Sequence, residues 1–219
     1  LPPEVAALLP ARIEAVELAA GAMLYEAGSV LRHVYFPVTA VVSLVSPLQD
    51  GACTEVAVVG REGVVGVCAF MGGGRALSGA VVQSGGHALR MSARAIAWHA
   101  SHSDAFMQQL LCYTQALFTH MAQTSACNRH HELDQQLCRW LLLNLDRRNG
   151  NDVTVTHERI AGMLGVRREG VTGAAMKLTP FSVSRARMAA DSSTEIDEQS
   201  TSIFGLLAPE SRPSLPNTT

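Results

Sequence analysis

The segment VTHERIAGMLGVRREGVTGAAMKL, residues 155–178, constrains the fold of this chain more than any other. Its apolar residues recur at helical spacing, stop at Leu-Gly-Val and then resume. Thr156 can cap a helix that begins at His157, and Gly165 supplies the positive φ that lets a chain turn sharply. The pattern therefore predicts two short helices that cross at a tight turn.

The apolar positions indicate which side of each predicted helix is buried. The inner positions are Ile160, Ala161 and Leu164 in the first helix, Val166 at the corner, and Val171, Ala174, Ala175 and Leu178 in the second. The small side chain of Ala161 allows the two helices to cross closely. The residues left outside, at or near the amino end of the second helix, are Arg167, Arg168, Glu169 and Thr172.

Such a pair of helices has the form of a helix-turn-helix, whose second helix enters the major groove of DNA. Arginine can bind guanine O6 and N7, and glutamate can accept from cytosine N4, so we expect Arg168 to make the main base contact. The alternative is that Arg-Arg-Glu forms a solvated face on an ordinary helical hairpin. Charge favours DNA: residues 129–187 hold 10 Lys and Arg against 6 Asp and Glu, although the whole chain has a net charge of -2.

Residues 23–91 have the pattern of an antiparallel β structure. Short Val-rich runs, separated by glycine-containing turns, begin at residues 41, 54, 79 and 87 (VVSLVS, TEVAVV, GAVVQS and HALRM). Asp50-Gly51, between two of these runs, is the strongest hairpin signal in the chain. Turns at such short intervals favour a sandwich or a barrel.

A long helix is predicted over residues 101–128, where glycine is absent. One stripe of this helix consists of Phe106, Leu110, Tyr113, Leu117, Met121 and Thr124. The stripe can be covered by the β structure or by a second copy of the chain, and the near-heptad spacing leads us to expect the second copy. A further amphipathic helix, which ends in DRRNGND, has as its apolar side Leu133, Leu137, Trp140, Leu141 and Leu145.

Composition sets the remaining expectations. Residues 179–219 include 13 Ser or Thr among 41 residues and are expected to be mostly disordered. No stretch approaches the roughly 20 apolar residues of a membrane span, and the amino end lacks a signal-peptide pattern, so we expect a cytoplasmic protein without a membrane partner. The five cysteines form no CxxC pair, which favours buried, reduced thiols over disulfides or a zinc site.

With these elements in this order, the chain resembles the Crp/Fnr family of bacterial transcription regulators over roughly residues 5–178. The cap, the small residue at 161, the glycine at 165 and the Arg-Glu pair at 168 and 169 fall where the family has them. The resemblance implies an α+β fold with three parts, namely an antiparallel β-roll sensor (a jelly-roll-like double-stranded β-helix) over 1–100, a dimerisation helix over 101–128 and a helix-turn-helix domain over 129–178.

The resemblance also implies a site and its partners. Arg168 and Glu169 would contact bases, His157 and Arg167 would contact phosphate, and Thr172 lies beside them on the second helix. The protein would be a homodimer on a palindromic site in double-stranded DNA, with RNA polymerase as a further partner if it is an activator.

Two departures from the family concern the effector. Members that bind cyclic nucleotides carry Gly-Glu and Arg-Ser-Ala in the roll, but residues 66–70 and 78–80 lack both the carboxylate and the arginine. Arg75 is a candidate substitute that we expect to be solvated, so cyclic AMP is not the expected ligand. No cysteine precedes Cys53, which argues against an iron-sulfur cluster, and the histidines form no metal-binding pattern. The effector is left open.

A third departure concerns the wing of the DNA-binding domain. The family continues after the second helix into a two-stranded wing, whereas residues 179–193 (TPFSVSRARMAADSS) have no glycine-centred hairpin, so the wing is expected to be incomplete. The predicted function is a transcription regulator and not an enzyme, since no P-loop, nucleophile elbow or dinucleotide fingerprint is present. The alternatives are a sensor or interaction module that has lost DNA binding, and a β-roll enzyme with a bound metal.

Overall fold

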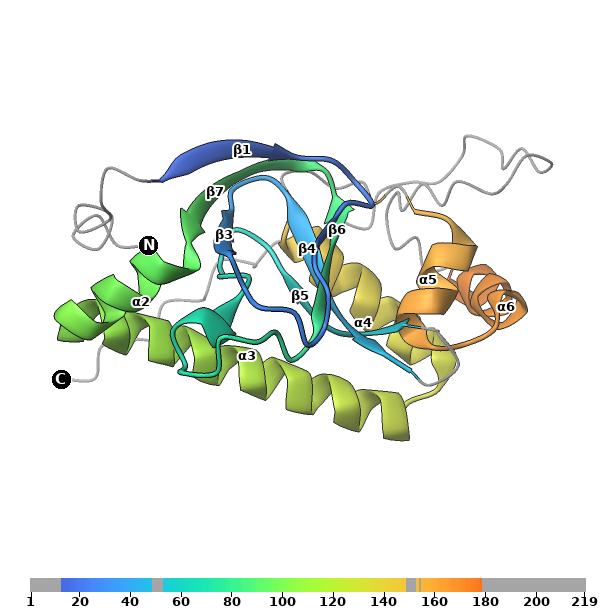
Figure 1. Ribbon diagram of the computed structural model, residues 1–219. Coiled ribbons are helices and arrows are strands. Elements are labelled where there is room, and N and C mark those ends of the chain that lie inside the picture. Colours follow the sequence, from blue (N-terminus) through green and yellow to red (C-terminus); the bar gives the residue numbers. More distant parts are fainter. Residues whose placement is uncertain (1–12, 49–52, 149–152, 154, 179–219) are drawn as a thin grey trace, which may run out of the picture.

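The computed structural model describes residues 13–48, 53–148, 153 and 155–178 (Figure 1). The strands are β1 (Glu14–Leu18), β2 (Met23–Tyr25), β3 (His33–Pro37), β4 (Val41–Pro47), β5 (Cys53–Val59), β6 (Gly79–Ser84) and β7 (Gly86–Ser92). The helices are the 3-10 helix η1 (Val67–Ala69), α2 (Ala93–His102), α3 (Asp104–His130), α4 (Leu133–Asp146), α5 (His157–Leu164) and α6 (Arg168–Leu178). Within these described ranges, no helix combines the length and the apolar character that a membrane span requires.

The strands form two antiparallel sheets, which together make the β-roll. One sheet has the order β1-β7-β3 and the other the order β2-β6-β4-β5. Val42 of β4 lies opposite Val59 of β5 and Val82 of β6, and all three valines are buried in one core cluster. The predicted antiparallel β-roll is thus confirmed. Strands β4 and β5 pair as expected, while the turn residues Asp50 and Gly51 lie outside the described residues.

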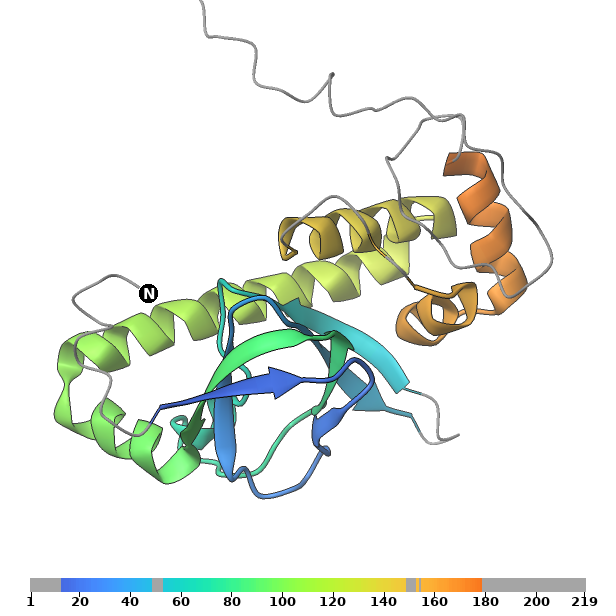
Figure 2. The ribbon, with the colours of Figure 1, turned by 90° about the horizontal axis from the view of Figure 1, so that it is seen from above.

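Helix α3 runs along one side of the β-roll (Figures 1 and 2). Phe106, Leu110 and Leu117 are buried, and Tyr113 and Met121 pack partly buried against the same clusters of roll residues. The expectation that this stripe pairs with a second copy is therefore wrong, because the roll of the same chain covers it. Spacing shows that one side of a helix is apolar but not which surface covers that side. Helix α2, before α3, was not anticipated.

Gly63 and Tyr113 approach each other closely where α3 meets the roll. A Cβ atom added to Gly63 would lie 2.4 Å from the Tyr113 hydroxyl, so residue 63 has no room for a side chain. Burial raises the pKa of Tyr113 to about 12, which keeps the phenol neutral at physiological pH.

Helix α4 begins just after α3 and turns back beside its carboxyl-terminal half (Figure 2). Its apolar side packs on α5 and α6, which together with α4 form a unit that we call the helical module. The core of this module is formed by Leu137, Trp140, Leu141, Val153, Val155, Ile160, Ala161, Val171 and Ala174. The predicted apolar side of α4 is confirmed, with Leu133 and Leu145 at its partly buried edge.

The cysteines are all free thiols, but most of them are not buried. Cys127 is buried, Cys68 and Cys138 are half-buried, and Cys53 and Cys112 are exposed. The expectation of buried thiols is thus wrong for Cys53 at the start of β5 and for Cys112 on the outer side of α3. A cysteine side chain is small, so its exposure costs little hydrophobic free energy.

Candidate nucleic-acid interface

The turn between α5 and α6 has the geometry that the sequence predicts. The Thr156 hydroxyl accepts from the backbone N–H of Arg159 at 3.2 Å and caps α5. Gly165 ends the helix with φ of 68°, in the left-handed region, and the next N–H, of Val166, donates to the Ala161 carbonyl at 3.0 Å. The chain therefore turns sharply at Gly165, and two residues, Val166 and Arg167, separate this glycine from the start of α6.

The inner faces of the two helices pack on each other and on α4. Ile160, Ala161, Val171 and Ala174 are buried, and the remaining predicted inner residues, Leu164, Val166, Ala175 and Leu178, are partly buried against them. Gly170 lies so near α4 that an added Cβ would be 2.9 Å from Cδ2 of Leu133. These contacts orient the first turn of α6 relative to the rest of the helical module.

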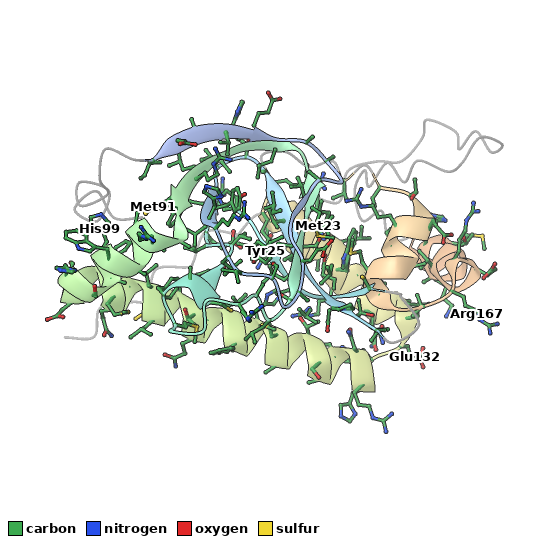
Figure 3. The ribbon with its side chains drawn as sticks, viewed as in Figure 1. Met23, Tyr25, Met91, His99, Glu132 and Arg167 are labelled. Atoms are coloured by element: carbon green, nitrogen blue, oxygen red, sulfur yellow. The ribbon has the colours of Figure 1, made fainter. Side chains whose placement is uncertain are left out.

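Arg167, Arg168 and Glu169 are exposed at the amino end of α6. The Arg167 side chain points away from the β-roll, at the far end of the molecule from His99 (Figure 3). The amino end of a helix carries partial positive charge, so two arginines there oppose the helix dipole. A bound anion, such as a phosphate group, would relieve this repulsion.

His157 and Thr172 are paired with each other rather than freely exposed. Nδ1 of His157 lies 3.0 Å from the Thr172 hydroxyl, which also donates to the Arg168 carbonyl at 3.2 Å. Both residues are half-buried. Burial and the nearby charge of Arg168 lower the pKa of His157, so its ring is neutral at pH 7. The pair links the first turns of α5 and α6 beside Arg168.

The stretches of the β-roll that correspond to a nucleotide-binding site have a different character. Residues 66–70 form η1 and its flanks, where Gly66 has φ of 103°. Arg75 is exposed, as expected, and its guanidinium donates to the Gly28 carbonyl at 2.9 Å. Tyr25 lies partly buried against the roll core, and burial raises its pKa well above the usual value. No group of three His, Cys, Asp or Glu side chains suited to a metal occurs among the residues that the structure describes.

Other polar residues, which sequence reasoning missed, lie between the β-roll and the helical module. Arg147 at the end of α4 donates to the Val58 carbonyl at 3.0 Å, and Arg159 of α5 donates to the Val82 carbonyl at 3.0 Å. Glu55 of β5 is buried beneath α4. The contacts of these residues depend on how the two parts of the chain meet, which local spacing does not reveal.

Taken together, a β-roll, a long helix and a pair of helices joined by a tight turn define a class of two-part proteins in which a roll is joined to a helical module. Residues 15–100 match the family model of the cyclic nucleotide-binding domain. The chain thus contains a cyclic nucleotide-binding-like domain and has the overall fold of the Crp/Fnr transcription regulators.

Three solved structures illustrate the likeness. The c-di-GMP-responsive global regulator CLP of Xanthomonas campestris has a TM-score of 0.65 at 12% identity, with 84% of this chain and 95% of that chain covered. FixK2 of Bradyrhizobium japonicum has a TM-score of 0.62 at 16% identity, with 78% of this chain and 86% of that chain covered. A CRP-family transcriptional regulator of Thermus thermophilus has a TM-score of 0.62 at 21% identity, with 76% of this chain and 85% of that chain covered. None of the curated proteins matches this sequence.

Proposed function

We propose that this protein is a sequence-specific, DNA-binding transcription regulator of the Crp/Fnr type and not an enzyme. It acts as a cytoplasmic homodimer in which the β-roll responds to an effector and the two α6 helices contact a palindromic site. The observation that carries the proposal is the exposed cluster of Arg167, Arg168 and Glu169 on the first turn of a helix that follows a tight, glycine-capped turn.

We assign different contacts to the residues of this cluster. Arg168 is the first residue of α6, which suits a contact with guanine, and Glu169 beside it suits a contact with cytosine. Arg167 precedes the helix and suits a phosphate contact. The Thr172 hydroxyl is bonded to the Arg168 carbonyl, and the neutral His157 lies beside that hydroxyl. Both side chains offer hydrogen bonds rather than charge.

The competing function is a sensor or interaction module that no longer binds DNA. The reason to consider it is the segment that follows α6, where a complete wing is expected to be absent, and this segment lies outside the described residues. RNA polymerase is a further partner if the protein activates transcription.

Selection from a pool of random duplex DNA tests the proposal. We expect the full-length protein to enrich a palindrome whose half-sites lie roughly 34 Å apart. The logarithm of the binding constant should fall linearly with the logarithm of salt concentration, with a slope of about -0.9 per phosphate contact. A folded protein that enriches no sequence would support the competing function.

The outer side of α3 offers a surface for the second copy. Leu111 and Phe118 are 46% and 51% exposed, and they lie two helical turns apart on the side away from the roll. Gln115 and Ala122 continue the same stripe, with 4-3-4 spacing from Leu111 to Ala122. We infer that this outer stripe, rather than the stripe predicted from the sequence, pairs across the two-fold axis.

Replacing Phe118 by aspartate should therefore weaken the dimer. Two carboxylates would face each other across the axis, and a large apolar contact would be lost, so we expect the dimer dissociation constant to rise about tenfold or more. Sedimentation equilibrium measures this change. Leu77→Asp is the matched control, because Leu77 is 83% exposed on a roll loop. An unchanged dissociation constant for Phe118→Asp would exclude the outer stripe as the interface.

A further inference from the structure

Several polar contacts attach the helical module to the β-roll. Arg147 donates to the Val58 carbonyl of β5 and forms an ion pair of 2.8 Å with Glu62. Arg159 reaches from α5 to the Val82 carbonyl of β6. Polar contacts of this kind can be exchanged for water at moderate cost, which distinguishes the interface from the apolar cores on either side of it.

Glu55 is the buried carboxylate at the centre of this interface. It lies on β5, opposite Val45 of β4, and is 8% exposed. The Ser43 hydroxyl donates to its Oε2 at 2.5 Å. The carboxylate borders a small cavity between the two parts of the protein. Its walls include His120, Thr124 and Cys127 from α3, Arg139, Trp140 and Leu143 from α4, and Met163 and Leu164 from α5.

The polar groups around Glu55 are incompletely paired. None of the ion pairs among the described residues includes Glu55. Arg139 donates to the Thr124 hydroxyl at 3.3 Å, and Arg147 is bound to Glu62 and to backbone carbonyls. Within the part of the chain that the structure describes, no hydrogen-bond partner is found for Nε2 of His120. A negative charge on Glu55 is therefore poorly compensated when α4 covers it.

We propose that Glu55 is a proton-sensitive contact between the β-roll and the helical module: its protonated form favours docking of the module, and loss of the proton weakens docking. The contact itself does not depend on DNA binding. Its use to regulate DNA binding rests on the function proposed above.

The titration of Glu55 falls in the physiological range. Burial raises its pKa to about 7, although the Ser43 hydroxyl, the Trp140 indole and the charges of Arg147 and Arg139 partly oppose the shift. Undocking would expose the carboxylate and return its pKa toward the ordinary value of 4.5. Because the docked state has the higher pKa, the contribution to docking is complete below about pH 4.5 and is lost as the pH rises through about 7.

The other titratable groups at the interface do not account for the same transition. Burial, together with the charges of Arg147 and Arg139, lowers the pKa of His120 to about 4, so that ring is already neutral when Glu55 titrates. Met163 and Leu164, which α5 contributes to the cavity, are uncharged. Cys127 also borders the cavity, where its Sγ accepts from the Gln123 side chain at 3.2 Å.

Fluorescence of Trp140 provides the test. The chain contains two tryptophans, and Trp98, which stacks on the His102 ring with centroids 4.1 Å apart, would add its own emission to that of Trp140. The measurement therefore uses the full chain with Trp98→Phe. We expect Trp140 emission to change with a midpoint near pH 7, and hydrogen exchange in α4 and α5 to accelerate above that midpoint.

Three variants decide between outcomes. Glu55→Gln, which mimics the protonated carboxyl, should abolish the transition, whereas Glu17→Gln, at an exposed position of β1, should retain it. Ser43→Ala removes a donor to the anion and should move the midpoint to higher pH. A flat titration in the parent, or a transition that survives in Glu55→Gln, would overturn the proposal. The transition without DNA binding would instead leave the contact standing and refute the proposed function.

Discussion

Replacing Ile160 by alanine is expected to lower the stability of the helical module by about 2 to 5 kcal/mol. Ile160 is fully buried between α4, α5 and α6, and its loss would leave a cavity lined by residues such as Leu137 and Val171. Hydrogen exchange followed peptide by peptide measures the effect. Exchange in α5 and α6 should accelerate markedly, while the β-roll, which has its own core, should change little.

The matched control for this variant is Met176→Ala. Met176 lies on α6 in the same module but is 66% exposed, so its truncation should change stability by less than about 0.5 kcal/mol. If Ile160→Ala and Met176→Ala behaved alike, the packing of α5 against α4 and α6 would be incorrect. The position assigned to the amino end of α6 would then be incorrect as well.

Replacing Arg168 by alanine should weaken binding to the selected palindrome by about 1 to 3 kcal/mol per half-site. Because the side chain is assigned a base contact, the loss should also relax sequence preference at one base pair of each half-site. Competition binding against the palindrome with each of the four bases at that position measures both effects. The α6 fold should survive, since Arg168 is exposed.

Arg167→Ala is the control variant for Arg168→Ala, because it distinguishes a phosphate contact from a base contact. Arg167 lies one residue before α6 and is assigned a phosphate contact, so its loss should weaken binding to all sequences equally and reduce the magnitude of the salt slope by about 1 per half-site. If Arg168→Ala produced that uniform loss instead, Arg168 would be the phosphate contact and the assignment of roles would have to be reversed.

Strands β4 to β7 and the helical pair could be predicted from the sequence because their signals are local, whereas no run indicated β1, β2 or β3. Val-rich runs between glycine turns indicated β4 to β7, and the order Thr156, Gly165 and Arg168 indicated the cap, the corner and the start of α6. The wrong choice concerned Phe106 and its stripe, since spacing identifies an apolar side without identifying its partner. Only the fold shows that the roll occupies that side.

The interface between roll and helices could not be predicted, for a related reason. Glu55 stands in TEVAVV, where alternation allows a solvent-facing side chain, and nothing local indicates that Trp140 lies over it. The pairing of His157 with Thr172 likewise depends on the crossing of α5 and α6, 15 residues apart in the chain. Contacts of this kind arise from tertiary structure alone.

The close approach of Gly63 and Tyr113 also has an evolutionary consequence. A methyl group at position 63 would overlap the Tyr113 ring, so a larger residue there is tolerated only after position 113 has become smaller. The reverse order passes through an intermediate in which the Tyr113 side chain must be displaced. The two positions are therefore expected to change in a fixed order among descendants of this protein. Position 113 should become smaller before position 63 becomes larger, so these two sites would record the order of substitutions between two functional sequences.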